Sequence, residues 1–431
     1  MSYREWMRGV PMLVLLSLCP KAALAATYYV APTGSDVNPG SEPRPFASFA
    51  RAQQSAQPGD TVLFRGGTYA IKSATAADGV LLSKSGQSGR RIAYVAAEGE
   101  RPVLDFAGMT ARQRITGIRV TASWVYLAGF EIKGVPQRIN TANESWGIYN
   151  LGNDNVYERL DIHHIAGPGL FIGGGSRNLV LNCDAHHNFD PLSKAGPGEN
   201  ADGFGCHGKG TGNVFRGCRA WWNTDDGFDF ISAQGTCAVE QSWAFYNGYM
   251  PGTFTSAANG AGFKAGGYGS NPIPPLPPRH TVRGCLAFRN KAAGFYANHH
   301  PIGGDWLNNT AYANARDFDM LVSPGGNPSH KLRNNVGHGS RTVVANFTGR
   351  DDAFNAWKLP VGVSDLDFES VDLTGTDGPR QPDGSLPALP FMKLRADSDL
   401  IDRGTDVGLP FQGAAPDLGA FERAPTLAPA E

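Results

Sequence analysis

A six-residue motif recurs five times in the middle of the chain, and its polar and apolar positions keep constant places. Each copy has alanine at the third position, an aromatic or imidazole ring at the fourth and asparagine at the sixth. The copies are Cys183–Asn188, Cys218–Asn223, Ser242–Asn247, Cys285–Asn290 and Asn309–Asn314. Their asparagines lie 35, 24, 43 and 24 residues apart. The bare repeat is therefore the shortest spacing, and the longer spacings contain inserted loops.

A second pattern, a short apolar segment built around Gly-Phe in most copies, follows each asparagine. Its copies are Asp202–Gly205, Asp226–Asp229, Ala261–Lys264, Ala293–Tyr296 and Arg316–Asp319, with weaker copies at Trp146–Tyr149 and Gly169–Ile172. Short strands that recur at this period, separated by Gly and Asn, are typical of a parallel β-helix, whose coils stack and bury a continuous core. We therefore expect an all-β fold, a parallel β-helix solenoid.

Stacking of the coils would turn each motif position into a row of residues. Because adjacent parallel strands lie about 4.8 Å apart, equivalent residues of successive coils lie directly on one another. The alanines would then occupy places where only a small side chain fits. The asparagines would form a ladder, each bonding to the backbone at a turn and to its neighbour. The fourth motif positions would form a stack of rings: His186, Trp221, Phe245, Phe288 and Tyr312.

The two ends of the chain depart from the repeat. Residues Phe46–Ala56 have helical spacing, and a short N-terminal helix there would cap the open end of the solenoid. After about residue 345 the repeat fades, although Phe354, Trp357 and Phe391 make the remainder too apolar for a linker. We expect residues 26–345 to form the β-helix and residues 346–431 to form a C-terminal extension packed on it.

The first 25 residues have the pattern of an export signal. Arg4 and Arg8 precede an apolar run over Pro11–Leu18, and Ala23–Ala25 fits a signal peptidase site. The apolar run is too short to span a bilayer. We therefore expect residues 1–25 to be a signal peptide and the mature protein to be secreted, either extracellular or periplasmic, with no membrane partner.

Composition narrows the choice of partners. The formal net charge is −1 and only 18% of residues are charged, so we expect no nucleic-acid partner and only a local site for any polyanion. We also expect a monomer. Cys19 belongs to the signal segment, and the five remaining cysteines leave at least one unpaired. We expect Cys183 and Cys218 to pack as small apolar groups, the alternative being a disulfide between coils.

The repeat aligns charged residues in two neighbouring rows. Asp202 and Asp226 share one position on adjacent coils, and Asp229 and Lys264 share the position three residues further on. Residues three apart in an extended strand point to opposite faces. Asp226 and Asp229 can therefore serve one site only if the chain bends between them, which Gly227 would permit.

Asp225 brings the number of neighbouring carboxylates to four. Such a group repels itself unless a cation lies among its members, and Ca²⁺ accepts several carboxylate oxygens in flexible geometry. Asp225, Asp226 and Gly227 alone would indicate only a turn. Alignment with the other coils favours a calcium site formed by Asp202, Asp225, Asp226 and Asp229.

Lys264 lies among small residues that leave its amine accessible. The alternative to a functional role is a solvated surface lysine. Calcium nearby would lower the pKa of the amine, which suits a general base. The pairs His163–His164, His186–His187 and His299–His300 are adjacent in sequence, and adjacent strand residues point to opposite faces. We therefore expect these histidines to be structural or to face substrate rather than to bind a metal.

Several of these segments resemble family 9 polysaccharide lyases, which are pectate lyases with a right-handed parallel β-helix and an asparagine ladder. The resemblance is carried by Asn200–Gly205, Gly212–Ala220, Asp225–Asp229 and Gly262–Lys264, and it extends from Thr27–Val30 to Ala415–Phe421. It implies that Asp202, Asp225, Asp226 and Asp229 bind Ca²⁺, that Lys264 is the catalytic base and that the substrate is polygalacturonate. Residues that contact the sugar stay unassigned, with Lys209, Arg216 and Arg219 as basic candidates.

The resemblance implies β-elimination, in which neutral Lys264 removes the C5 proton of a galacturonate, and hence an alkaline pH optimum. Three alternatives remain open. A polygalacturonase-type glycoside hydrolase would use the aspartates as acid and base without calcium. A C5-epimerase would share the proton abstraction but not the elimination. A non-catalytic carbohydrate-binding solenoid would hold calcium for structural reasons only.

Overall fold

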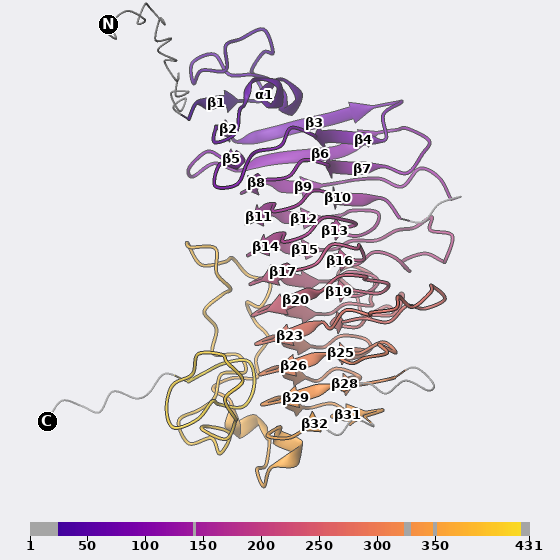
Figure 1. The fold of residues 1–431 in the computed structure, drawn as a ribbon, viewed down its shortest axis with the longest axis vertical. Helices are drawn as coiled ribbons and strands as arrows, with labels where there is room; N and C mark the ends of the chain where they lie inside the picture. Colours follow the sequence, from indigo (N-terminus) through magenta and orange to yellow (C-terminus); the bar gives the residue numbers. More distant parts are fainter. Residues whose placement is uncertain (1–24, 141–143, 323–328, 348–350, 424–431) are drawn as a thin grey trace, which may run out of the picture.

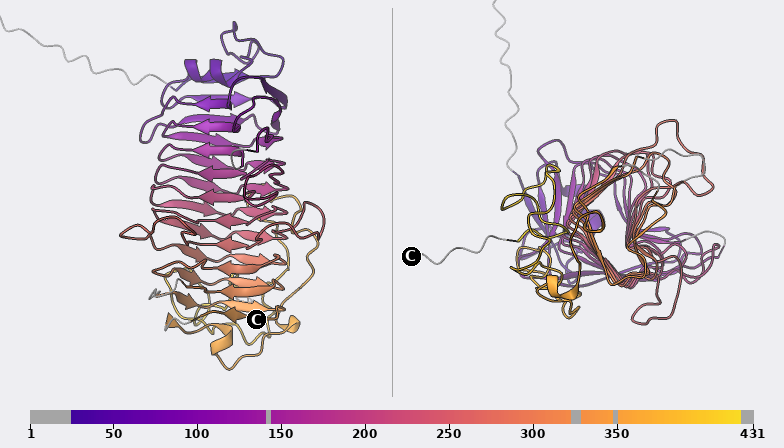
Figure 2. Two further views of the ribbon diagram at one scale, coloured as in Figure 1. Left: turned by 90° about the vertical axis from the view of Figure 1, so that its right-hand side faces the viewer. Right: turned by 90° about the horizontal axis from the view of Figure 1, so that it is seen from below.

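A computed structural model describes residues 25–140, 144–322, 329–347 and 351–423. The chain winds into stacked coils whose strands form three parallel sheets along the long axis (Figures 1 and 2). The predicted parallel β-helix is therefore confirmed. The predicted signal peptide lies outside the described residues except for its last residue.

Among the described residues, the three sheets contain 12, 10 and 10 strands, all paired with parallel neighbours in the same spatial order. The first sheet comprises β1 (Thr27–Val30), β2 (Thr61–Phe64), β5 (Ile92–Ala96), β8 (Val125–Ala128), β11 (Val156–Glu158), β14 (Leu179–Leu181), β17 (Asn213–Arg216), β20 (Cys237–Glu240), β23 (Thr281–Arg283), β26 (Asp305–Leu307), β29 (Lys331–Arg333) and β32 (Asp351–Asp352).

The second sheet comprises β3 (Gly67–Ser73), β6 (Pro102–Met109), β9 (Glu131–Lys133), β12 (Asp161–His163), β15 (Asp184–His186), β18 (Arg219–Trp221), β21 (Trp243–Phe245), β24 (Leu286–Phe288), β27 (Thr310–Tyr312) and β30 (Val336–His338). The third comprises β4 (Asp78–Leu82), β7 (Thr116–Val120), β10 (Trp146–Asn150), β13 (Leu170–Ile172), β16 (Phe204–Cys206), β19 (Phe228–Asp229), β22 (Phe263–Lys264), β25 (Ala293–Tyr296), β28 (Arg316–Asp319) and β31 (Val344–Ala345).

The two sequence patterns interlock inside the coil. A Cβ placed on Gly203 would lie 2.7 Å from the Cβ of Ala220 and 3.0 Å from Nδ2 of Asn223. Each Gly-Phe segment therefore needs its glycine because the alanine and asparagine of the next coil pass close by. The phenylalanines that follow point inward, and the rings of Phe204 and Phe228 stack with centroids 5.0 Å apart. The core is thus built coil upon coil from the same two motifs.

The predicted asparagine ladder is present and buried. Nδ2 of each asparagine donates to Oδ1 of the next, at 2.8 Å from Asn188 to Asn223 and 3.0 Å from Asn223 to Asn247. The ladder continues at 2.9 and 3.0 Å through Asn290 to Asn314. Because both ends of every amide are bonded, the buried polar turns carry no desolvation penalty.

The residue before each ladder asparagine has a left-handed backbone, although it is never glycine in these five copies. Its φ is 55° at His187, 53° at Trp222, 54° at Tyr246, 53° at Arg289 and 52° at Ala313. Such a conformation is uncommon for residues other than Gly, Asn and Asp. It turns the chain sharply at the edge of the second sheet, and the neighbouring side chains consequently lie on the same side of the backbone.

The predicted capping helix is α1 (Phe49–Ser55), which covers the first coil (Figure 1). The hydroxyl of Ser48 accepts the Arg51 backbone N–H at 3.1 Å and so begins the helix. Phe49 packs on Phe64 with ring centroids 4.2 Å apart. This contact closes the N-terminal end of the core.

The C-terminal extension contains two short 3-10 helices, η1 (Ala356–Lys358) and η2 (Asp365–Asp367). It folds back along the outer face of the second sheet, where it lies beside the lower coils in Figure 1. It covers the predicted ring stack, in which Trp221 and Phe245 have centroids 5.6 Å apart and interplanar angle 2°. Phe391 packs edge-on against Phe288 at 5.0 Å.

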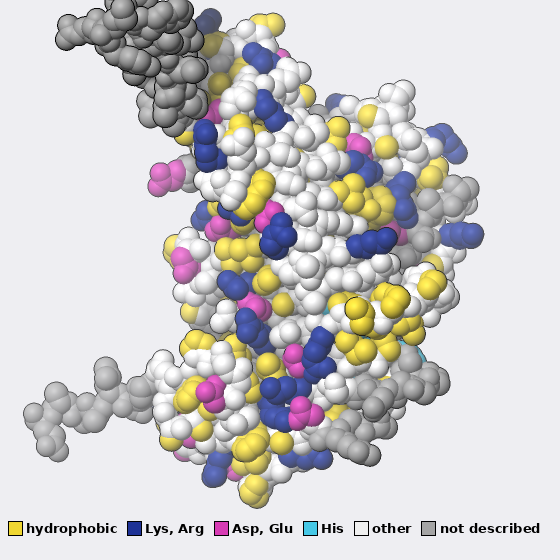
Figure 3. Space-filling model, viewed as in Figure 1, with side chains coloured by type: hydrophobic (Ala, Val, Ile, Leu, Met, Phe, Trp, Pro, Cys, Tyr) yellow, Lys and Arg dark blue, Asp and Glu magenta, His cyan; other side chains and the backbone are white. Residues whose placement is uncertain are grey.

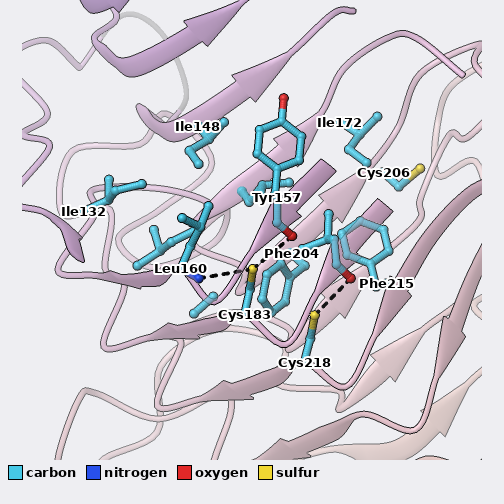
Figure 4. Packing of buried hydrophobic residues seen from close by; sticks show 14 of the residues in the cluster. Ile132, Ile148, Tyr157, Leu160, Ile172, Cys183, Phe204, Cys206, Phe215 and Cys218 are labelled. Carbon is cyan, nitrogen blue, oxygen red and sulfur yellow. Dashed lines mark hydrogen bonds between the residues drawn. The ribbon is translucent and has the colours of Figure 1, made fainter. Parts of the chain in front are cut away.

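The cysteines follow the prediction in part. Cys183 and Cys218 are free and buried in the core between coils, as expected (Figure 4). Cys285 is the third free, buried thiol in the described part of the chain. Cys206 and Cys237 form a disulfide, which the sequence reasoning did not identify.

Charged side chains of both signs are interspersed on the face drawn in Figure 3. No helix within the described ranges is long and apolar enough to cross a membrane.

Candidate active site

The four aspartates and Lys264 meet on the outer face of the third sheet, as their alignment predicted. Gly205 pairs with Asp229 and Asp229 pairs with Lys264 in the register of β16, β19 and β22. The chain bends at Gly227. As a result Asp226 and Asp229 both reach the same amine: Nζ of Lys264 donates to their Oδ2 atoms at 2.9 and 3.1 Å. We call Asp202, Asp225, Asp226 and Asp229 the aspartate cluster.

One oxygen of each carboxylate is held by a backbone N–H. The distances are 3.1 Å from Asp226 N to Asp202, 3.1 Å from Asn259 N to Asp225, 2.6 Å from Ala261 N to Asp226 and 2.7 Å from Ile231 N to Asp229. In every case the bonded atom is Oδ1. The backbone therefore orients all four carboxylates, and the second oxygens of Asp226 and Asp229 share the Lys264 amine.

The carboxylates are close together and nearly inaccessible. Oxygens of Asp202, Asp225 and Asp226 lie within 4.8 Å of one another, and so do ligand atoms of Asp202, His207 and Asp229. No member of the aspartate cluster is more than 4% exposed. Asp202 belongs to both groups and links them. The donor set is rich in carboxylate oxygen, which suits a hard divalent cation such as Ca²⁺.

Burial and mutual repulsion act in the same direction on these groups. Burial and the charge of Asp225 raise the pKa of Asp202 well above its ordinary value. The pKa of Asp225 is likewise raised well above its ordinary value, by burial and by Asp226. Burial raises the pKa of Asp226 as well, although Lys264 opposes this rise. The aspartate cluster therefore holds more negative charge than one ammonium compensates.

Lys264 is correspondingly held in its charged form. Burial lowers the pKa of its amine, but the charges of Asp226 and Asp229 raise that pKa well above the ordinary value. The residue is 8% exposed, so the alternative of a solvated surface lysine is wrong.

A cavity of about 400 Å³ opens beside Lys264 towards the C-terminal coils. The row of Lys264 continues through Tyr296 and Asp319 on β25 and β28, and all three residues line the cavity. Arg316, whose side chain is 57% exposed, pairs with Asp319 at 2.7 Å. The cavity thus offers an aromatic ring and a guanidinium next to the amine, groups that suit an acidic sugar.

Three of these residues were missed by the sequence reasoning. Tyr296 and Asp319 occupy the Lys264 row, so the periodicity could have identified them. Arg316 occupies the row of Asp202 and Asp226, but its neighbour on the adjacent coil is Ala293. Two of the three basic candidates lie elsewhere, whereas Lys209 is exposed in the segment that follows β16 and His207. Arg216 pairs with Glu240 on the first sheet at 2.7 Å, and Arg219 is buried in an ion pair with Asp184.

His207 is a further residue that the sequence did not indicate. Its Nε2 lies 3.9 Å from Oδ2 of Asp229 and is buried without a hydrogen-bond partner within the described residues. Burial lowers the pKa of this imidazole. A buried nitrogen without a partner beside a carboxylate suits a bound ligand, since buried polar atoms are normally hydrogen-bonded.

The carboxylate spacing argues against an inverting glycoside hydrolase. Inverting enzymes place their acid and base about 6.5–9.5 Å apart to leave room for a water. Ligand oxygens of three of the aspartates lie within 4.8 Å of one another, next to an ammonium. This arrangement leaves no room for that water, whereas it does suit a cation.

Comparison with known proteins places the fold in a family. The family model described as "Pel9A-like, right handed beta helix region" matches residues 28–335, so the predicted handedness is confirmed. The chain is 36% identical over 403 residues to "Pectate lyase L" of Dickeya dadantii (strain 3937), covering 92% of this chain and 90% of that relative.

Two solved structures are similar over most of their length. The crystal structure of pectate lyase Pel9A matches with a TM-score of 0.79 and 34% identity, covering 93% of this chain and 96% of that chain. A structure described as "Rhamnogalacturonan lyase" matches with a TM-score of 0.80 and 36% identity, covering 86% and 97%. Both similar proteins are lyases.

Proposed function

Because the chain belongs to the Pel9A-like right-handed β-helix family of polysaccharide lyases, we propose that it is a calcium-dependent pectate lyase that cleaves (1→4)-α-D-galacturonan by β-elimination. The observation that carries this proposal is the contact of the Lys264 amine with two carboxylates of a buried, under-compensated aspartate cluster. A base and a cation site are thereby adjacent beside a cavity.

The aspartate cluster fits calcium by its donor set. Its oxygens are buried and close, the pKa values of Asp202, Asp225 and Asp226 are raised, and the Nε2 of His207 beside it has no partner within the described ranges. Asp202, Asp225, Asp226 and Asp229 would hold the ion. When bound, calcium would draw electron density from the C6 carboxylate of a galacturonate and acidify its C5 proton.

The residues of the chain would then act in sequence. Arg316 and Tyr296 orient the uronate in the cavity. Because Asp226 and Asp229 raise the pKa of the Lys264 amine, its neutral form requires a cation on the aspartate cluster that offsets their charge. Neutral Lys264 takes the C5 proton, and the electron pair of the C5–H bond forms the C4–C5 double bond. The C4–O bond breaks, and the departing oxygen takes a proton from solvent. The reaction consumes no water, so no second activated carboxylate is needed. Because the base must be neutral, activity should increase towards alkaline pH.

Rhamnogalacturonan is a second candidate substrate. It is favoured by the similarity to a structure described as a rhamnogalacturonan lyase, with TM-score 0.80 and 36% identity. Both polymers contain galacturonate, so the same base and the same cation would serve. The difference would lie in the sugar on the leaving side of the bond.

The test is to incubate metal-depleted protein with polygalacturonate or rhamnogalacturonan, with and without added calcium, and to follow the ultraviolet absorbance of the new double bond. We expect a calcium-dependent rise, larger with polygalacturonate. A larger rise with rhamnogalacturonan would show that rhamnogalacturonan, and not polygalacturonate, is the preferred substrate. Reducing ends formed without any absorbance would indicate hydrolysis, and an epimerised but uncleaved polymer would indicate a C5-epimerase. If neither polymer changes, the non-catalytic carbohydrate-binding solenoid would be the remaining alternative.

The signal segment leads us to propose export as well. The mature protein should begin at Ala26 and occur outside the cytoplasm as a monomer. Mass spectrometry of the exported form and light scattering would check both statements. A mature protein that retains residues 1–25 would contradict the proposed cleavage.

A further inference from the structure

Two histidine pairs lie away from the aspartate cluster, at the ends of β12 and β15 on the second sheet. They are His163 with His164 and His186 with His187. Adjacent positions in a strand predict that the members of each pair point to opposite faces. This expectation is wrong, because the second member has a left-handed backbone, with φ 53° at His164 and 55° at His187. The two rings of each pair therefore face each other.

The facing atoms are ring nitrogens. Nδ1 of His163 lies 2.6 Å from Nδ1 of His164, and Nδ1 of His186 lies 2.7 Å from Nδ1 of His187. At these distances the two nitrogens of a pair share at most one proton, so at least one of them has a free lone pair. The pairs also stack on each other: the His163 and His186 centroids are 5.0 Å apart at 14°.

The far nitrogens of the inner rings are held by carboxylates. Nε2 of His163 lies 3.2 Å from Oε1 of Glu131, and Nε2 of His186 lies 2.9 Å from Oδ1 of Asp161. Arg101 bonds the second oxygen of both carboxylates at 2.8 Å, which fixes them in place. A carboxylate at Nε2 keeps the proton there and leaves Nδ1 as the electron donor. Metal-binding histidines are oriented in this same way.

From this geometry we propose that each histidine pair chelates one borderline divalent cation, Zn²⁺ being the representative, through its two Nδ1 atoms, with water completing the coordination. The cation takes the place of the proton between the two nitrogens. Zinc–nitrogen bonds of about 2.0–2.1 Å require the two nitrogens to separate to roughly 3.4 Å. His164 is exposed, so its ring can make this small movement into solvent.

The site differs chemically from the aspartate cluster. Imidazole nitrogen selects zinc, nickel and copper, whereas calcium takes oxygen ligands. The chain runs from His187 through the ladder residue Asn188 towards Asp202. A cation on the histidine pairs would therefore order the turns that precede Asp202. It would also stabilise the folded state, because the unfolded chain lacks the paired geometry.

The test is a calorimetric titration of the full, metal-depleted protein with ZnCl₂ in excess calcium, which keeps the aspartate cluster occupied. We expect two sites, and a melting temperature that increases with zinc. The variant His164→Asn should lose one site, and His164→Asn with His187→Asn should lose both, with binding weakened at least tenfold. Asparagine tolerates the left-handed backbone, so the fold should persist.

The control variant is His338→Asn, which removes a histidine that pairs with Asp365 outside both histidine pairs. It should bind zinc like the parent protein. Zinc binding that is unchanged in the double variant, or absent from the parent, would overturn the proposal. Because the readout is binding rather than cleavage, it does not depend on the proposed lyase function.

Discussion

Buried carboxylates occur in two contrasting settings in this molecule. Asp184 on the second sheet is 9% exposed and accepts hydrogen bonds from Arg219 at 2.7 and 2.9 Å and from Arg380 at 2.6 Å. Burial raises its pKa, but the two guanidinium groups bring the pKa below its ordinary value. Asp202, Asp225 and Asp226 of the aspartate cluster are buried at least as well, yet their pKa values are raised.

The difference separates a structural role from a functional one. Arg219 also donates to the carbonyls of Thr376 and Gly378, so the compensated Asp184 joins the C-terminal extension to the coils. In the described structure, the carboxylates of the aspartate cluster are not neutralised by an equal number of cationic side chains. They repel one another, and a bound cation would reduce this repulsion. The under-compensated charge of the aspartate cluster supports the proposed cation site.

The largest expected effect is on catalysis. Lys264→Ala should lower kcat by about 10³-fold, within the range of about 10²–10⁴-fold that a general base contributes. The reason is that no other amine contacts the aspartate cluster among the described residues. Initial rates on polygalacturonate measure this loss. Lys72→Ala, which removes an exposed lysine of β3 on the second sheet, should leave kcat within twofold; equal rates for the two variants would contradict the assigned base.

Removing Asp184, whose charge is compensated by two arginines, should reduce the stability of the fold. Asp184→Ala leaves Arg219 buried without a carboxylate, and we expect a loss of about 3 kcal/mol in the free energy of unfolding. Urea denaturation at neutral pH measures it. The contribution is complete above the unfolded pKa of 3.8 and is lost as pH falls below that value, because the folded pKa is lower. Asp372→Asn on the surface of the extension should change stability little. A loss similar to that of Asp184→Ala would contradict the special contribution of the buried, compensated carboxylate.

Removing one carboxylate from the aspartate cluster should instead increase the stability of the calcium-free protein. Asp202→Asn should stabilise the calcium-free protein by about 1 kcal/mol, since a pKa raised by one unit corresponds to about 1.4 kcal/mol. The asparagine can still accept the Asp226 N–H. Thermal melts with chelator should show the gain, and melts with calcium should favour the parent protein. Destabilisation in both conditions would assign Asp202 a structural role.

Asp317 is a buried carboxylate outside both settings, and the pH dependence of stability that it causes extends the comparison. Burial raises the pKa of Asp317 to about 8, and its partners Ser340 and Asn314 are neutral. Between pH 3.8 and about 8 the folded state binds more protons than the unfolded state, so stability should decrease as pH rises through this window. Asp317→Asn should flatten that decrease in denaturation measured at several pH values. An unchanged slope would contradict the assignment.

The rows of the β-helix could be predicted because they repeat. The asparagine ladder, the ring stack and the register of Asp229 with Lys264 all follow from motifs aligned at the length of one coil. Asp184 and Arg219 also share a motif position, so their pairing was present in the alignment although it was not recognised. Features without a period were not predictable in this way.

The left-handed backbone at His187 recurs in all five motif copies, but it has no signal in the residue type, and it reversed the expectation for the histidine pairs. Two features without a period were also missed. Arg380 reaches Asp184 from 196 residues further along the chain. His207 follows its strand at a position where the next coil carries Ile231. Each depends on tertiary contacts that a single coil does not encode.

Calcium binding to the aspartate cluster is tested most directly by calorimetric titration of the metal-depleted protein with CaCl₂, without substrate. The parent protein and Asp372→Asn should bind calcium alike. Asp202→Asn should bind at least tenfold more weakly, because it loses the carboxylate common to both groups of close ligand atoms. Equal calcium affinity in Asp202→Asn and the parent protein, or no binding by either, would contradict the calcium site.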